Sequence, residues 1–168
     1  MYTVRKAGEK DIALIQELCL KVWPQTYQGI ISEEQIKYML DLMYSTDNLS
    51  SQLNNGFLFF LLYDNQIPIG YAGMEKTENN CFKLHRLYVI TTNHRKGAGS
   101  YFIEQIERFV SEQKGTSIEL QVNRANSAVD FYKKKGFYIV KEADFEIGKG
   151  FYMNDYIMRK DITFAAIN

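Results

Sequence analysis

The spacing of apolar residues along the chain predicts which segments are helices and which are strands. Apolar positions three or four residues apart predict an amphipathic helix, and strict alternation predicts a half-buried strand. Helices are predicted at residues 11–22, 33–43, 98–113 and 126–135, with a short helical turn at 48–53. Strands are predicted at residues 2–6, 57–63, 67–76, 82–90, 117–122, 137–147 and 151–160. The order β-α-α-β-β-β-α-β-α-β-β predicts an α/β fold, with a mixed, largely antiparallel sheet covered by helices on both faces.

Several helix boundaries carry their own signals. Asp11 is a suitable cap or first-turn acid for the first long helix, which we expect to end before Pro24. Ser32, followed three residues later by Gln35, resembles a capping box. Gly136 is placed to end the last helix with a positive φ.

Composition and charge exclude several classes of protein. The 168 residues are 46% hydrophobic and 24% charged, which predicts one folded domain over 1–168. A formal net charge of zero argues against nucleic acid as a partner. No apolar run approaches the ~20 residues that span a bilayer, so no membrane partner is expected. Cys19 and Cys81 have no metal-ligand spacing, so we expect no metal and a reducing, cytoplasmic location.

The most informative stretch joins the strand at 82–90 to the helix at 98–113. The first amides of a helix lack internal partners and favour anions, so this junction predicts a phosphate-binding turn. It lacks the Lys and Ser/Thr that follow the last glycine of a Walker loop, and Phe102 stands where a dinucleotide fingerprint needs a small residue. Glycines chosen for turn geometry alone are the alternative. The glycines, cations and hydroxyl that suit an anion are Arg95, Lys96, Gly97, Gly99 and Ser100.

This turn resembles the acetyl-coenzyme A pyrophosphate loop of GNAT-type N-acetyltransferases, whose pattern is Gln/Arg-x-x-Gly-x-Gly/Ala. The sequence here reads His94-Arg95-Lys96-Gly97-Ala98-Gly99, so His94 departs from the family's Gln or Arg. The preceding Leu87-Tyr88-Val89 matches the family's strand, whose backbone pairs with the pantetheine arm.

A second match lies downstream, at residues 126–137. The run Asn126-Ser127-Ala128-Val129-Asp130-Phe131-Tyr132-Lys133-Lys134-Lys135-Gly136-Phe137 is similar to the family's Asn-x-x-Ala-x-x-Phe-Tyr-x-x-x-Gly-Phe, with one residue fewer between Asn126 and Ala128. Two motifs in the right order are far more specific than either alone. The resemblance implies the GNAT acyl-CoA N-acyltransferase fold and acetyl-CoA as the acetyl donor. The residues it implies for coenzyme binding are Leu87, Tyr88, Val89, His94, Arg95, Lys96, Gly97, Ala98, Gly99, Ser100, Asn126 and Tyr132.

The chemistry of acetyl transfer assigns further roles. The attacking amine must lose a proton, the thioester oxygen must be stabilised, and the departing thiolate needs an acid. Tyr132 is the candidate acid and the Val89 amide the candidate donor to the oxygen, while Asn126 either contacts the coenzyme or caps a helix. For the base, His85, Glu75 and a chain of water molecules are all open, because Lys83 stands where some relatives have glutamate.

The acceptor is predicted to be a small molecule with a primary amine, attacked directly in a ternary complex. Trp23-Pro24-Gln25-Thr26-Tyr27 suggests the small-molecule branch of the family, some members of which acetylate polyamines. Trp23, Tyr27 and Tyr156 are the candidate acceptor-binding residues, with core packing as the alternative. Acidic side chains that suit a cationic amine, with capping and solvation as their alternative, are Glu33, Glu34 and Asp155.

Two other functions are compatible with the same sequence features. One is a catalytically degenerate module that binds coenzyme A or acyl-CoA, and the other is acetylation of proteins or peptides. The last hairpin, rich in Tyr and Phe, leaves a homodimer and packing within one protomer equally open.

Overall fold

The computed structural model describes residues 1–91 and 96–163. The chain divides into two compact units. The first unit contains Met1–Glu75 and Arg86–Ile103, and the second contains Lys76–His85 and Glu104–Asn168.

Antiparallel strands form the sheet of the first unit. Strands β1 (Tyr2–Ala7), β2 (Leu58–Asp64) and β3 (Ile67–Lys76) pair in chain order. Strand β4 (Cys81–Val89) contributes its Arg86–Val89 end, and beyond it the Ile90 amide donates to the Ile69 carbonyl at 2.7 Å. Gly70 of β3 allows a close approach here, because a Cβ at this position would lie 2.6 Å from the Tyr88 carbonyl oxygen.

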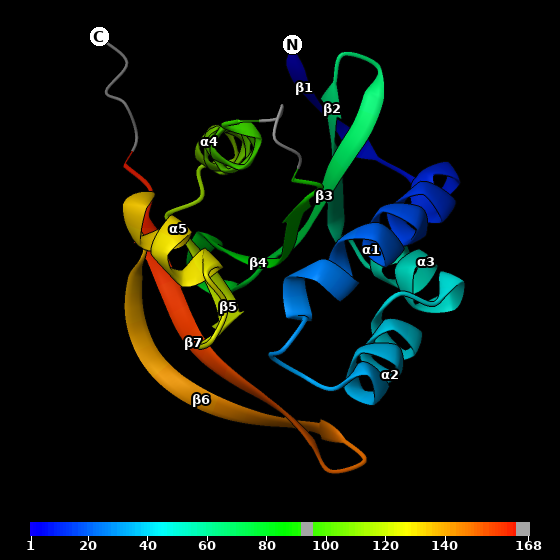
Figure 1. Ribbon diagram of the computed structural model, residues 1–168. Coiled ribbons are helices and arrows are strands. Elements are labelled where there is room, and N and C mark those ends of the chain that lie inside the picture. Colours follow the sequence, from blue (N-terminus) through cyan, green and yellow to red (C-terminus); the bar gives the residue numbers. More distant parts are fainter. Residues whose placement is uncertain (92–95, 164–168) are drawn as a thin grey trace, which may run out of the picture. The chain divides into compact units, whose positions relative to one another are not determined.

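Helices α1 (Ile12–Tyr27), α2 (Glu33–Met43) and α3 (Thr46–Asn54) belong to the first unit and follow one another from blue to cyan (Figure 1). The predicted cap at Ser32 is confirmed, since its hydroxyl accepts from the Gln35 amide at 3.1 Å. Ser45 caps α3 in the same way through the Asn48 amide at 3.2 Å. This second cap makes α3 longer than the single turn expected at residues 48–53.

Pro24 lies inside α1, so the predicted end of this helix before Pro24 is wrong. A proline lacks the N–H that would bond the carbonyl four residues earlier, which normally stops a helix. Here the helix continues because Trp23 and Tyr27, on either side of the proline, are both buried. Both contact Tyr88 of a remote strand: its ring centroid lies 5.9 Å from that of Trp23, and its hydroxyl lies 2.9 Å from that of Tyr27. Tertiary packing therefore outweighs the local preference.

In the second unit the strands run in the order β4, β5, β7, β6. Strand β5 (Ser117–Asn123) is parallel to β4 and antiparallel to β7 (Phe151–Asp161). Strand β6 (Tyr138–Gly148) pairs with β7 in a long curved hairpin (Figure 1).

Two helices accompany these strands. Helix α4 (Ala98–Glu112) begins in the first unit and continues in the second from Glu104, and α5 (Ala128–Lys134) follows β5. Helix α4 packs on the sheet face that carries Phe82 and Lys160: Phe82 lies edge-on to Phe109 at 6.4 Å, and Lys160 Nζ is 2.7 Å from Glu107 Oε1. Gly136 ends α5 with φ +88°, as predicted.

The predicted fold class is confirmed. The described residues form seven strands and five α-helices, and the predicted element order is observed with α3 as an additional helix. The β1–β2, β2–β3, β5–β7 and β6–β7 pairs are antiparallel and the β4–β5 pair is parallel, which gives a mixed α/β fold with a largely antiparallel sheet.

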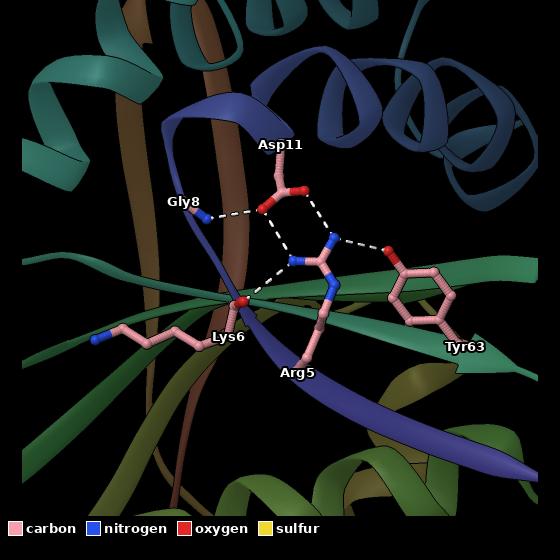
Figure 2. A network of polar contacts seen from close by, with 5 residues as sticks. All are labelled: Arg5, Lys6, Gly8, Asp11 and Tyr63. Atoms are coloured by element: carbon pink, nitrogen blue, oxygen red, sulfur yellow. Dashed lines mark hydrogen bonds and ion pairs between the residues drawn. The ribbon is translucent and has the colours of Figure 1, made fainter. Parts of the chain in front are cut away.

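The turn between β1 and α1 is held by a network around Arg5 and Asp11 (Figure 2). The Arg5 guanidinium donates to both carboxylate oxygens of Asp11, at 2.7 and 3.0 Å, and also to the Tyr63 hydroxyl of β2 at 2.9 Å. The Gly8 amide donates to Asp11 at 2.9 Å. The Arg5 hydrogen bonds, followed by the Gly8 amide, lower the pKa of Asp11 to about 2.

We expect Asp11→Asn to lower the free energy of unfolding by about 1–2 kcal/mol at pH 7, because it weakens two charge-assisted hydrogen bonds. The pKa of Asp11, about 2 in the native state, lies below its ordinary 3.8. The stabilisation is therefore complete above about pH 4 and is lost as the pH falls toward 2. Urea unfolding at pH 7, 4 and 3 measures it. Asp41→Asn, at an exposed position of α2, is the control, and equal unfolding midpoints for the two variants at pH 7 would contradict the expectation.

Candidate active site

The predicted phosphate-binding turn lies at the start of α4. Gly97 has φ +80°, a left-handed conformation that favours glycine, and, its two chain neighbours aside, no heavy atom of residues 1–91 and 96–163 lies within 4 Å of a Cβ built there. The Tyr101 amide donates to the Gly97 carbonyl at 2.9 Å. The amides of Ala98, Gly99 and Ser100 precede this hydrogen bond, so they point toward the open end of the helix. This arrangement suits an anion.

Other residues of the turn are only partly described. Lys96 is exposed, and its carbonyl accepts a hydrogen bond from the Tyr2 hydroxyl at 3.2 Å, which ties the turn to β1. The Tyr2 ring also packs on Tyr101, with centroids 5.7 Å apart. His94 and Arg95 lie outside the described residues.

The end of β4 brings Leu87, Tyr88 and Val89 together as half-buried residues. Tyr88 meets the end of α1: its hydroxyl lies 2.9 Å from the Tyr27 hydroxyl, and its ring centroid lies 5.9 Å from that of Trp23. Two predicted acceptor residues therefore adjoin a predicted coenzyme-binding residue. Trp23 is 2% exposed and Tyr27 is 6% exposed, so both are also core residues.

Beneath these rings lies a buried polar cluster. The Tyr44 and Tyr71 hydroxyls are 2.9 Å apart, and burial raises the pKa of both phenols well above the ordinary value. Burial also raises the pKa of the Cys19 thiol to about 11. Trp23 Nε1 has no hydrogen-bond partner among the residues the structure describes.

Arg86 completes the cluster. Its guanidinium donates to Gln52 Oε1 at 2.9 Å and to the Met43 carbonyl at 3.1 Å, and it lies 4.9 Å from the centre of the Tyr44 ring. Sequence reasoning missed this residue. The sequence did contain a signal, because side chains alternate between the two faces of a strand. Arg86 is two residues after Leu84 and four after Phe82, so it shares their buried face of β4.

In the second unit, Tyr132 projects from α5 and is 7% exposed. Its ring packs edge-on against Phe131 and Phe137, with centroids 5.3 and 5.5 Å away. Asn126 precedes the same helix, and its Oδ1 accepts from the Ala128 amide at 2.9 Å. This hydrogen bond is the capping role left open for Asn126, while a contact with coenzyme stays a prediction.

The candidate bases and the remaining acceptor residue, Tyr156, belong to three different strands. His85 is an exposed residue of β4, and Glu75 is a half-buried residue of β3. Tyr156 of β7 is half-buried as well. Their assigned roles stay predictions.

The three candidate acids for a cationic amine differ in environment. Glu33 and Glu34 are exposed in the first turn of α2, where acidic side chains stabilise a helix. Asp155 is fully buried on β7.

Residues 1–91 and 96–163 contain neither a cluster of metal-ligating side chains nor a membrane-spanning helix. Among these residues there is no group of three or more His, Cys, Asp or Glu side chains arranged to hold a metal ion. No helix in the same part of the chain has the length and apolar character needed to cross a membrane.

Comparisons with known proteins agree on one family. Residues 28–158 match the model of the acetyltransferase (GNAT) domain. A spermidine N(1)-acetyltransferase of Thermoplasma acidophilum is 29% identical over 142 residues, which are 81% of this chain and 88% of that protein.

Solved structures give the same result. A PaiA N-acetyltransferase from Thermoplasma acidophilum, crystallised in complex with coenzyme A, is 27% identical with a TM-score of 0.79, covering 96% of this chain and 99% of the other. The ribosomal-protein-S18-alanine N-acetyltransferase from Escherichia coli shares the fold, with 17% sequence identity and a TM-score of 0.73. The match covers 100% of this chain and 98% of that one. The chain therefore belongs to the GNAT acetyltransferase family, which confirms the family predicted from the turn before α4 and the motif around α5.

Proposed function

We propose that this acetyltransferase transfers the acetyl group of acetyl-CoA to a primary amine of a small polyamine. The observation that carries the proposal is the start of α4, where an open glycine turn presents the helix amides to an anion. The family motif falls on this turn, and a neighbour of known structure holds coenzyme A.

The chain's own residues would hold the diphosphate of the coenzyme. The amides of Ala98, Gly99 and Ser100 supply donors at the positive end of the α4 dipole, and Lys96 adds charge beside them. Gly97 keeps the approach clear, because it carries no Cβ. His94 and Arg95 lie outside the described residues, and their contacts with the coenzyme stay predictions.

Transfer itself requires few groups. The neutral amine nitrogen attacks the thioester carbonyl carbon, the C–S bond breaks, and the amine proton leaves to a base. Tyr132 would return a proton to the departing thiolate, and the Val89 amide would stabilise the oxygen as it gains charge. His85, Glu75 and a chain of water molecules remain the candidate routes for the amine proton.

The acceptor class is inferred from the relative and from the residues. The spermidine N(1)-acetyltransferase shares most of its length with this chain. Trp23, Tyr27 and Tyr156 are proposed as acceptor contacts. Binding of coenzyme A without turnover would instead favour a degenerate module, and acetylation of peptides but not free amines would favour a protein acetyltransferase.

Spermidine and acetyl-CoA should give N-acetylspermidine, detected by mass spectrometry together with release of free thiol. Replacing Tyr132 by Phe should lower kcat roughly 100-fold, since general acid catalysis commonly contributes this much.

The matched control is Tyr138→Phe, because the Tyr138 hydroxyl is on exposed β6 and bonds Asp161. Full turnover by the Tyr132→Phe enzyme would remove the acid assignment. Absence of any amine acetylation by the wild-type protein would contradict the proposed function.

The coenzyme site can be tested at Gly97. Gly97→Ala should weaken coenzyme A binding about tenfold in calorimetry, because the methyl group occupies the open approach and strains the turn. Gly56→Ala is the matched control: Gly56 has φ +86° and equally open surroundings, so it carries the same strain of about 1–2 kcal/mol away from the turn. Equal loss of affinity in both variants would show that strain alone is responsible.

A further inference from the structure

Asp155 of β7 is a buried carboxylate. Its relative exposure is 0%, and within residues 1–91 and 96–163 neither carboxylate oxygen has a hydrogen-bond partner. A buried charge normally finds an opposite charge or several hydrogen bonds, because desolvation otherwise costs several kcal/mol. Burial raises the pKa of Asp155 to about 6, with Arg124 opposing and Asp144 reinforcing the shift.

The cation nearest in register is already engaged. Arg124 follows β5, and its amide donates to the Asn154 carbonyl at 3.0 Å, which places it beside Asp155. Its guanidinium, however, lies 2.7 Å from Asp144 and 3.9 Å from Glu142. On β6 the residue opposite Asp155 is the uncharged Ala143. The next β6 residue on the same face of the sheet is Lys141, which lies opposite Ile157.

The register also locates Asp155 within the second unit. The β4–β5 ladder comprises four pairs and ends at Leu84 and Leu120, whereas β5 continues to Asn123, which is opposite Asp155. The carboxylate therefore lies level with the stretch of β5 beyond its pairing with β4. Because side chains alternate along a strand, Asp155 faces away from the side on which Lys160 contacts α4.

The geometry points to Asp155 as the carboxylate that binds an ammonium group of the acceptor and so selects diamines and polyamines. This assignment rests on the proposed function. An ammonium ion supplies the missing donor and charge, and three N–H groups match an acceptor-only carboxylate.

The same electrostatics determine which nitrogen is bound. A carboxylate close to an ammonium favours its protonated form, so a nitrogen held by Asp155 stays charged and is not the nucleophile. The attacking nitrogen must then be a second amine on the same molecule. A monoamine would either occupy this carboxylate or react, and so should be a poor acceptor.

The test compares 1,4-diaminobutane with 1-aminobutane, which differ only in the second nitrogen. In Asp155→Asn the kcat/KM for the diamine should fall tenfold to a hundredfold, mainly through KM, while that for the monoamine changes less than about twofold. Asp161 forms an exposed ion pair with Arg159 on the same strand, so Asp161→Asn should leave kcat/KM unchanged for both the diamine and the monoamine. An unchanged preference for the diamine in Asp155→Asn would overturn the assignment.

A second measurement needs no turnover. At pH 8 the wild-type protein carries the buried charge and Asp155→Asn does not, so the variant should melt roughly 3–6 °C higher. Since the native pKa of about 6 lies above the ordinary 3.8, this difference should shrink as the pH falls from 6 to 4, where Asp155 binds its proton. Spermidine should raise the wild-type melting temperature at pH 8 and leave that of the variant unchanged.

The two arms separate the hypotheses. A wild-type protein that is stabilised by spermidine through Asp155 but acetylates no amine would contradict the proposed function and support the binding site. Acetylation with the same KM and the same spermidine-induced shift in Asp155→Asn would support the function and overturn the role of Asp155.

Discussion

The start of α4 is the constraint on which the account of this acetyltransferase depends. A helix leaves its first amides without internal partners. Here these amides follow Gly97, whose left-handed backbone conformation favours glycine. The helix axis cannot tilt to hide them, because its apolar stripe of Phe102, Ile103, Ile106 and Val110 is fully buried. The Tyr2 hydroxyl holds the Lys96 carbonyl on the other side of the turn. Burial of one face thus fixes the direction in which the donors point.

Two buried charges show how differently the chain treats ionised side chains. Arg86 is surrounded by acceptors and ring faces, so its desolvation is compensated within the protein. Asp155 has no hydrogen-bond partner among the described residues. The neighbouring cation, Arg124, forms its ion pair with Asp144. The first arrangement stabilises a core, whereas the second leaves an interaction for a ligand to complete.

Periodicity was sufficient for most of the fold. The apolar stripe of α4, the cap at Ser32 and the positive φ of Gly136 are local features, and each was predictable from a few neighbouring residues. The length of α1 was not, because the packing of Trp23 and Tyr27 that carries it past Pro24 involves residues remote in sequence. For the same reason, the surroundings of Arg86 and Asp155 could not be predicted from the sequence. A strand pattern predicts which face a side chain occupies, but the partners it meets come from other strands and helices.

The central claim is that the first amides of α4 bind the diphosphate of coenzyme A. A titration of the ¹⁵N-labelled protein with coenzyme A, followed by heteronuclear NMR, tests it most directly. Donation to an anion shifts an amide signal strongly, so Ala98, Gly99 and Ser100 should move most and saturate together. Coenzyme A that binds while these three signals stay in place would contradict the account.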